Sequence, residues 1–152
     1  MKVGGIEVVP APEEVLVLPR GDERLVFKAK PVKDWDRFNK LVPEVIIPVG
    51  YVKGEKKQLT NDKDYISQRS RRNDLMTAYM MLESLKPSNI EWDSVIDDEP
   101  GTWLKYEDDL RNAGLSNVEI NLVISLVFEA NQLDEKKLKA ARDSFLRGQE
   151  VA

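Results

Sequence analysis

The chain has 152 residues, of which 41% are hydrophobic and 33% are charged, a balance typical of a single folded domain. It contains no cysteine and no histidine, which excludes disulfides, catalysis by a thiolate or an imidazole, and metal sites built on either side chain. The net charge of −4 argues against nucleic-acid binding through bulk charge, and no apolar run reaches the roughly 18 to 20 residues that a membrane span needs.

The first 32 residues predict a β-hairpin arm. Two runs rich in β-branched and aliphatic residues, Val15–Leu18 and Leu25–Ala29, are separated by Pro19–Asp22, whose Pro-Arg-Gly-Asp sequence is typical of a turn. Ile6–Val9 is a candidate for a third short strand. Because an isolated hairpin is marginally stable, we expect this one to pack on helices or on another chain.

Residues 33–60 predict a short helix followed by an extended loop. Asp34 can cap the helix, Trp35 and Phe38 fall at helical spacing, and Pro43 ends it. The stretch Val45–Val52 contains proline and glycine and favours an extended loop, although a strand or a hairpin is the competing prediction.

A long helix is predicted from Asn61 to about Leu85. Its second half carries Leu75, Ala78, Leu82 and Leu85 at a spacing of three and four residues, which is the apolar stripe of a packed helix. The first half is polar and basic, so we expect it to be solvated or to bind a partner.

The acidic residues Asp97, Asp98 and Glu99 precede Pro100 and raise the question of a metal or catalytic site. Proline suits the first turn of a helix, and acidic side chains before that turn interact favourably with the helix dipole. The spacing of a regular calcium loop is absent, so we interpret the cluster as the start of a helix. That helix is predicted to end at Gly114 in a left-handed cap. The face that it buries is predicted to comprise Trp103, Tyr106, Leu110 and Ala113.

Two helices are predicted to complete the chain. Ser116 and Glu119 form a capping box that opens the first, and its apolar residues Ile120–Phe128 predict a central, buried helix. Asp134 is predicted to cap the second. Its inward-facing residues are predicted to be Leu138, Ala141, Phe145 and Leu146.

Two segments of opposite charge stand out. Lys53–Arg72 contains seven basic and three acidic residues, a net +4, and Glu91–Asp109 contains eight acidic residues and one lysine, a net −7. They could pair within the fold, present faces to other proteins, or simply be solvated. Arg69 and Arg72 have one nearby aromatic residue, Tyr65, so nucleic-acid binding is disfavoured.

The fold class predicted from these elements is α+β and predominantly α, with an N-terminal hairpin or small sheet followed by a bundle of four to five helices. We divide the single domain into an arm (1–32), a short helix with a loop (33–60) and a helical bundle (61–148). No arrangement of acidic, lysine or tyrosine side chains marks a catalytic pair. An enzyme is therefore disfavoured, and a carboxylate-dependent enzyme remains the third hypothesis.

Several short patterns follow one another along the chain. They are F-x-x-K before an aromatic helix that ends in Pro-Glu, a tryptophan before a P-x-T-W helix start, the turn A-G-x-S-x-x-E-I-N, and E-A-N-x-L before the last helix. Their residues are Phe27, Lys28, Lys30, Trp35, Phe38, Pro43, Glu44, Trp92, Pro100, Thr102, Trp103, Ala113, Gly114, Ser116, Glu119, Asn121, Glu129, Ala130, Asn131 and Leu133. In this order they resemble the tail assembly chaperones of siphophage-like tailed bacteriophages. Two departures are Val45–Pro48, where the family often has a Pro-Lys-Pro run, and Glu99 in place of aspartate.

The resemblance implies a non-catalytic protein of the host cytoplasm. It would bind the tape measure protein, keep that protein's hydrophobic helices soluble and help to recruit tail tube subunits. It implies no cofactor, no metal, no nucleic-acid partner and no membrane, and it does not specify an oligomeric state. The alternative hypothesis is a phage-encoded regulator or host-defence inhibitor. The residues that we expect to contact a partner are Trp35, Phe38, Val45, Ile46, Ile47, Tyr51, Tyr65, Ile66, Arg69 and Arg72.

Overall fold

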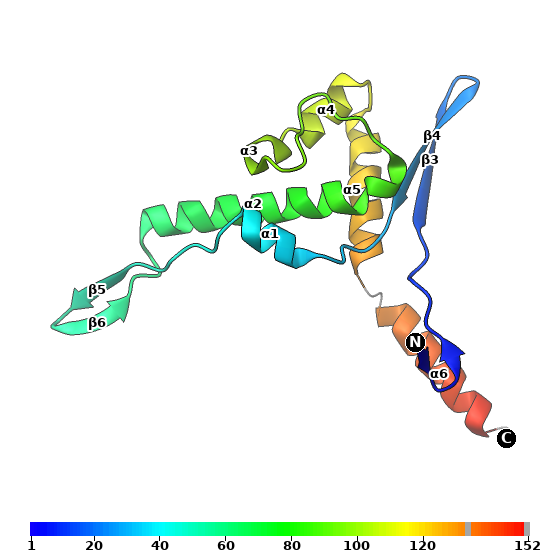
Figure 1. Cartoon of the computed structure of the whole chain (residues 1–152), viewed down its shortest axis with the longest axis horizontal. Coiled ribbons are helices and arrows are strands. Elements are labelled where there is room, and N and C mark those ends of the chain that lie inside the picture. Colours follow the sequence, from blue (N-terminus) through cyan, green and yellow to red (C-terminus); the bar gives the residue numbers. More distant parts are fainter. Residues whose placement is uncertain (133–134, 151–152) are drawn as a thin grey trace.

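The computed structural model describes residues 1–132 and 135–150, which form a helical core with projecting hairpins (Figure 1). The strands of this part of the chain are β1 (Lys2–Val3), β2 (Ile6–Glu7), β3 (Glu14–Arg20), β4 (Glu23–Ala29), β5 (Val49–Val52) and β6 (Glu55–Gln58). The helices are α1 (Trp35–Leu41), α2 (Lys63–Ser84), the 3-10 turn η1 (Lys86–Ser88), α3 (Pro100–Trp103), α4 (Tyr106–Asn112), α5 (Asn117–Asn131) and α6 (Glu135–Glu150). The α+β, predominantly helical class is confirmed. Leu133 and Asp134, the predicted cap of the last helix, lie outside the described residues.

Each strand pairs only with its neighbour in sequence, so the described part of the chain contains three separate two-stranded antiparallel sheets. The predicted first hairpin is present as β3 and β4, with Leu16 opposite Phe27. The prediction that Ile6–Val9 adds a third strand to the first hairpin was wrong. Ile6–Glu7 pairs with Lys2–Val3 and forms its own small hairpin, because glycines with positive φ at positions 4 and 5 turn the chain back at once.

The β3–β4 hairpin is part of the core. Leu18, Phe27 and Ala29 are buried in the same cluster as residues of α2 and α5, whereas Val15 and Val17 on the other face are exposed. The expectation that this hairpin packs on helices is confirmed.

Polar contacts attach the hairpin to the helices. The guanidinium of Arg20 donates to the carboxylate of Glu119 at the start of α5, with nitrogen–oxygen distances of 2.7 and 2.8 Å. The backbone N–H of Lys30 donates to the carbonyl of Ser84 at the end of α2 (3.0 Å). Asn131 accepts from the N–H of Val32 (2.9 Å) and donates to the hydroxyl of Ser84 (2.7 Å), so one side chain joins three segments.

The long helix predicted from Asn61 to Leu85 is present as α2, and its second half supplies the centre of the core. Aromatic rings gather on it. The ring of Tyr79 lies 5.3 Å from that of Phe38 and 5.5 Å from that of Trp103, measured between centroids. The indole N–H of Trp103 donates to the carbonyl of Asp97 (3.2 Å), which satisfies the one polar atom of this buried side chain.

The single helix predicted between Pro100 and Gly114 is in fact two helices, α3 and α4, which are separated at Leu104 and Lys105. Gly114 ends α4 as predicted, with φ 103°. The Gly114 N–H donates to the carbonyl of Arg111 (3.0 Å), and the Leu115 N–H donates to the carbonyl of Leu110 (3.1 Å). These are the two hydrogen bonds of a Schellman motif.

Two of the predicted burial patterns were wrong. Ala113 is exposed because the chain turns away at the cap. The capping box of Ser116 and Glu119 is present, but α5 is buried on one side only. Val118, with 70% of its surface exposed, lies with Leu122 and Phe128 on the uncovered side.

The prediction that α6 faces inward was also wrong. The helix extends away from the body beyond the end of α5 (Figure 1). Leu138, Phe145 and Leu146 are exposed, and so is Ala141. The amphipathic spacing predicted the helix correctly. Among the described residues, however, no element covers the apolar face of α6.

Candidate partner-binding surface

The segment between Pro43 and Leu59 projects from the N-terminal end of α2 (Figure 1). It is distinct from the predicted N-terminal hairpin arm of residues 1–32, and from here on the name arm refers to Pro43–Leu59 alone. The extended-loop prediction holds as far as Pro48, and beyond it the competing prediction of a strand or a hairpin is confirmed, because β5 and β6 form a hairpin. Its two-residue turn, Lys53 and Gly54, has φ values of 52° and 79°, and positive φ at both positions is the geometry that suits a tight hairpin.

The root of the arm is well defined. The N–H of Leu59 donates to the carbonyl of Pro48 (2.8 Å). Gly50 packs so closely that a Cβ there would lie 2.8 Å from the Leu59 side chain. The N–H of Asp62 donates to the Leu59 carbonyl (3.3 Å), and the Asp62 carboxylate caps α2 at Tyr65 (2.9 Å). The hairpin is therefore held at the start of the helix by specific contacts.

The arm exposes apolar side chains to solvent. Ile46 is 87% exposed and Tyr51 is 78% exposed, and Val49 and Val52 are also exposed. In the antiparallel register Tyr51 lies opposite Lys56 and Val49 opposite Gln58, so the two apolar side chains share one face of the hairpin with Lys56 and Gln58. An isolated two-stranded hairpin with an uncovered apolar face is marginal in water, so this face suits a partner that covers it.

A second exposed region lies along the first half of α2. Ile66 and Arg69 are exposed there, and Leu104, in the break between α3 and α4, is exposed on the opposite wall of an open groove. The groove is lined by Lys63, Ile66, Ser67, Ser70, Arg71, Asp74 and Leu104. Its lining combines two serines with the apolar side chains of Ile66 and Leu104, so it suits contact with an apolar side chain of a partner segment.

Three of the predicted contact residues are structural instead. Phe38 is 1% exposed and Tyr65 is buried, so neither presents a surface to a partner in this fold. The Arg72 guanidinium lies 5.0 Å from the Phe38 ring centroid and donates to the side chain of Asn39 (2.9 Å) and to the carbonyl of Pro43 (3.3 Å). Arg72 thus fixes the end of α1 on α2.

The remaining predicted residues fall between these cases. Val45 and Ile47 are half-buried, and Trp35 lies at the rim of the aromatic cluster, 5.4 Å from the ring of Tyr79. The structure places Ile46 and Tyr51 together on the arm and Ile66 with Arg69 on the adjoining helix. Val49, Val52 and Leu104 were missed, although the Lys53-Gly54 pair was a readable turn signal that would have found the first two.

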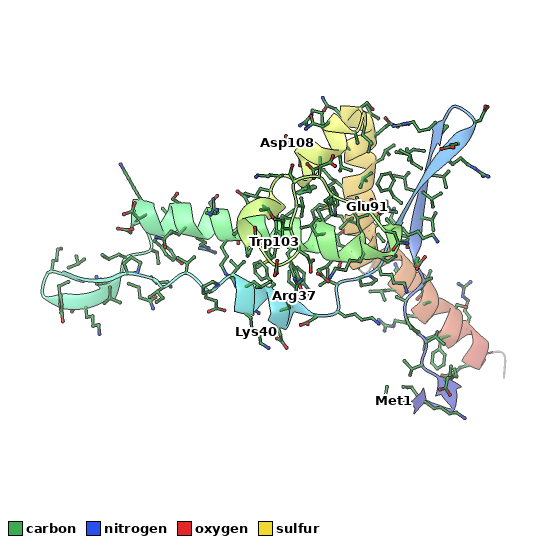
Figure 2. All side chains as sticks on the ribbon, turned by 45° about the horizontal axis from the view of Figure 1, so that its top comes forward. Met1, Arg37, Lys40, Glu91, Trp103 and Asp108 are labelled. Carbon is green, nitrogen blue, oxygen red and sulfur yellow. The ribbon has the colours of Figure 1, made fainter. Side chains whose placement is uncertain are left out.

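The acidic stretch before α3 has a structural partner. The Arg37 guanidinium donates to the carboxylates of Glu83 and Asp97, each at 2.8 Å, and the Lys86 ammonium lies 2.6 Å from Glu83. Figure 2 labels Arg37 and Trp103, which both bond to Asp97 where α1, α2 and α3 meet. Asp97 therefore joins α1, through Arg37, to α3, through Trp103, and its carboxylate lies 3.7 Å from the Lys86 ammonium in η1.

The basic and acidic segments do not pair in the described residues. No ion pair there joins Lys53–Arg72 to Glu91–Asp109; the acidic segment pairs with Arg37, Lys86 and the nearby Arg111 instead. In the same residues, 1–132 and 135–150, no group of three or more acidic side chains could hold a metal ion, and no helix is long and apolar enough to cross a membrane.

Comparisons with protein-family models, with curated proteins and with solved structures gave no match to this chain.

Proposed function

We propose that the chain is a non-enzymatic tail assembly chaperone of a tailed bacteriophage, which binds the tape measure protein and helps to recruit tail tube subunits in the host cytoplasm. The ordered series of short sequence patterns supports the proposal. The structural observation that carries it is the arm, which projects from a well-packed core and exposes Ile46, Val49, Tyr51 and Val52.

The physical basis is complementarity between exposed apolar surfaces. A tape measure protein is proposed to present hydrophobic helices before the tail closes around it. An arm with one apolar face can cover part of such a helix, and the groove between Ile66 and Leu104 can take another part. Lys53, Lys56 and Lys57 around the hairpin would favour a partner segment with acidic flanks.

The experiment is co-expression of the chain with the tape measure and tail tube proteins encoded beside it, followed by affinity capture and a solubility assay. The chain should hold the tape measure protein in the soluble fraction and capture it. Failure to bind either protein would overturn the proposal.

Matched variants make the arm itself testable. Tyr51→Asp places a charge on the apolar face, and Thr60→Asp adds the same charge at an exposed position outside the hairpin. We expect at least a tenfold loss of tape measure binding for the first, because the variant removes an apolar ring and places a carboxylate that must lose its water in the contact, and little change for the second. Equal effects of the two variants would show that the arm is not the binding surface.

A further inference from the structure

Two helices at the C-terminal end each carry an apolar face that the fold leaves uncovered. On α5, Val118, Leu122 and Phe128 are exposed within one side of the helix, which also carries Ser125 and the polar residues Asn121 and Glu129. On α6, Leu138 and Phe145 lie seven residues apart and Leu146 adjoins them; all three are exposed. Helix faces of this kind are normally buried against another helix.

An isolated α6 is expected to be only marginally stable as a helix in water. Helices shorter than about 12 to 15 residues are marginal in water, and most helical stability in proteins comes from packing of the apolar face. With 16 residues and its apolar face in solvent, α6 is close to that limit. The side chain of Phe145 is 64% exposed, so the contact that would stabilise the helix must come from elsewhere.

The charges of the two helices are complementary. Within Asn117–Asn131, Glu119 and Glu129 are the only charged residues; Glu119 is already paired with Arg20, so α5 offers the negative charge of Glu129 to a partner. Within Glu135–Glu150 there are five basic and three acidic residues, which gives α6 a charge of +2. Packing α6 on α5 therefore brings opposite charges together, whereas packing α6 on another α6 brings like charges together.

We propose that α6 of one copy packs on the exposed face of α5 of a second copy, and that the exchange is reciprocal, so that the chain is a symmetric dimer. In the structure α6 points away from α5 of its own chain, which leaves both faces open at the same time (Figure 1). A two-fold arrangement covers all four faces with one kind of contact. The helices match in length, with 15 and 16 residues, so each of the two contacts can run along the whole of both helices.

The first test is the mass of the full chain in solution, measured by light scattering after size exclusion over a range of concentrations. We expect twice the chain mass at micromolar concentration. Phe145→Asp and Leu122→Asp should each shift the dissociation constant upward by at least 30-fold, because each buries a charge in the apolar contact. Ala140→Asp adds the same charge to α6 away from the apolar face and should leave the dimer intact. A monomeric wild type, or a dimer that neither variant weakens, would overturn the proposal.

The second test identifies which chain covers α5. Because the sequence contains no cysteine, single cysteines are unique labels. Ser125 lies near the middle of α5 and Arg142 near the middle of α6, and both are exposed, so the pair is informative whether the helices run parallel or antiparallel. Differently tagged chains carrying Ser125→Cys or Arg142→Cys are refolded together and treated with a short bismaleimide.

A crosslinked pair that carries both tags supports exchange between copies. A chain that carries both Ser125→Cys and Arg142→Cys is treated in the same way. If it crosslinks within itself, α6 folds back on its own α5 and the proposal is overturned. Crosslinks confined to two Arg142→Cys chains would place α6 against α6 and would overturn it equally. The dimer does not rest on the chaperone proposal, because its readouts need no tape measure protein.

Discussion

Arg37 shows how a single residue organises this fold. It lies in α1, yet its guanidinium bonds to Glu83 in α2 and to both the carboxylate and the carbonyl of Asp97. The side chain is partly buried, so these bonds are less screened than those of a surface ion pair. Asp97, one of the acidic residues that looked like a candidate site in the sequence, is thereby explained by an arginine that is sixty residues away in the chain.

We expect Arg37→Ala to lower the free energy of unfolding by about 1 to 3 kcal/mol, the usual contribution of charge-assisted hydrogen bonds that are partly shielded from water. Arg111→Ala is the control, because among the described residues the Arg111 side chain pairs only with the exposed Asp108 on its own helix, and its loss should cost under about 0.5 kcal/mol. Urea unfolding of both variants measures the difference. Similar losses of unfolding free energy in the two variants would contradict the conclusion that Arg37 holds α1, α2 and Asp97 together.

Glu119 gives the fold a dependence on pH. Its hydrogen bond from Arg20, together with the backbone N–H of Ser116, lowers the pKa of this carboxyl to about 2 in the folded chain. A carboxyl whose folded pKa is depressed stabilises the fold above its unfolded pKa and loses that contribution as pH falls through the folded value. The contribution of Glu119 is therefore complete above about pH 4.5 and disappears toward pH 2.

Glu119→Gln should lower the melting temperature at pH 6 and should differ progressively less from the wild type as the pH approaches 2. Thermal unfolding at steps of half a pH unit measures the convergence. A difference between the two proteins that is constant over this range would mean that the Arg20 contact contributes nothing through charge.

At the scale of elements, helix ends were the most predictable part of the structure. Gly114 with its left-handed φ, the capping box at Ser116 and the cap at Asp34 are local devices, and local chemistry can be read from local sequence. The break between α3 and α4 was not predicted, since Leu104 and Lys105 are ordinary helix formers. Trp103 and Tyr106 are both buried in the core, and residues three apart share a face in a continuous helix as well, so their apolar spacing could not reveal the break.

The two glycines at either end of this region allow a clean comparison. Gly114→Ala should destabilise the chain by about 1 kcal/mol or more, because the position has φ 103° and a side chain is strained there even though the space around it is open. Gly101→Ala, inside α3, also meets open space but has no positive φ, so we expect it to be neutral or to stabilise by about 0.4 to 1 kcal/mol. Chemical denaturation distinguishes the signs. A loss of equal size at both positions would show that the cap is not under conformational strain.

Burial on α5 and α6 could not be predicted for a different reason. Periodicity states which residues share a face, but it does not state whether another element lies against that face. The apolar spacing of Leu138 and Phe145 predicted the helix and its amphipathic character correctly, and the inward orientation failed. The same limit applies to Phe38, an aromatic residue that looked available in the sequence and is buried against Tyr79.

At the scale of the whole molecule, stability is concentrated between β3 and α5. Every buried hydrophobic residue of the described core falls between Leu18 and Val127, so neither the N-terminal β1–β2 hairpin nor α6 contributes one. The arm contributes none between Pro43 and Leu59. The molecule therefore combines one packed body with projections whose apolar residues do not stabilise the isolated chain, and such residues are expected to work in contacts with other chains.

A chain that ends at Gln132 separates the two parts. We expect it to fold with a urea midpoint close to that of a monomeric Phe145→Asp chain, because the deletion removes no residue of the described core. Dimerisation should be lost, since the deletion removes the whole of α6. Circular dichroism during urea titration and light scattering on the same samples measure both properties. If the shortened chain is unfolded, α6 stabilises the body directly and the division into core and projections is wrong; if it still forms a dimer, the interface lies elsewhere.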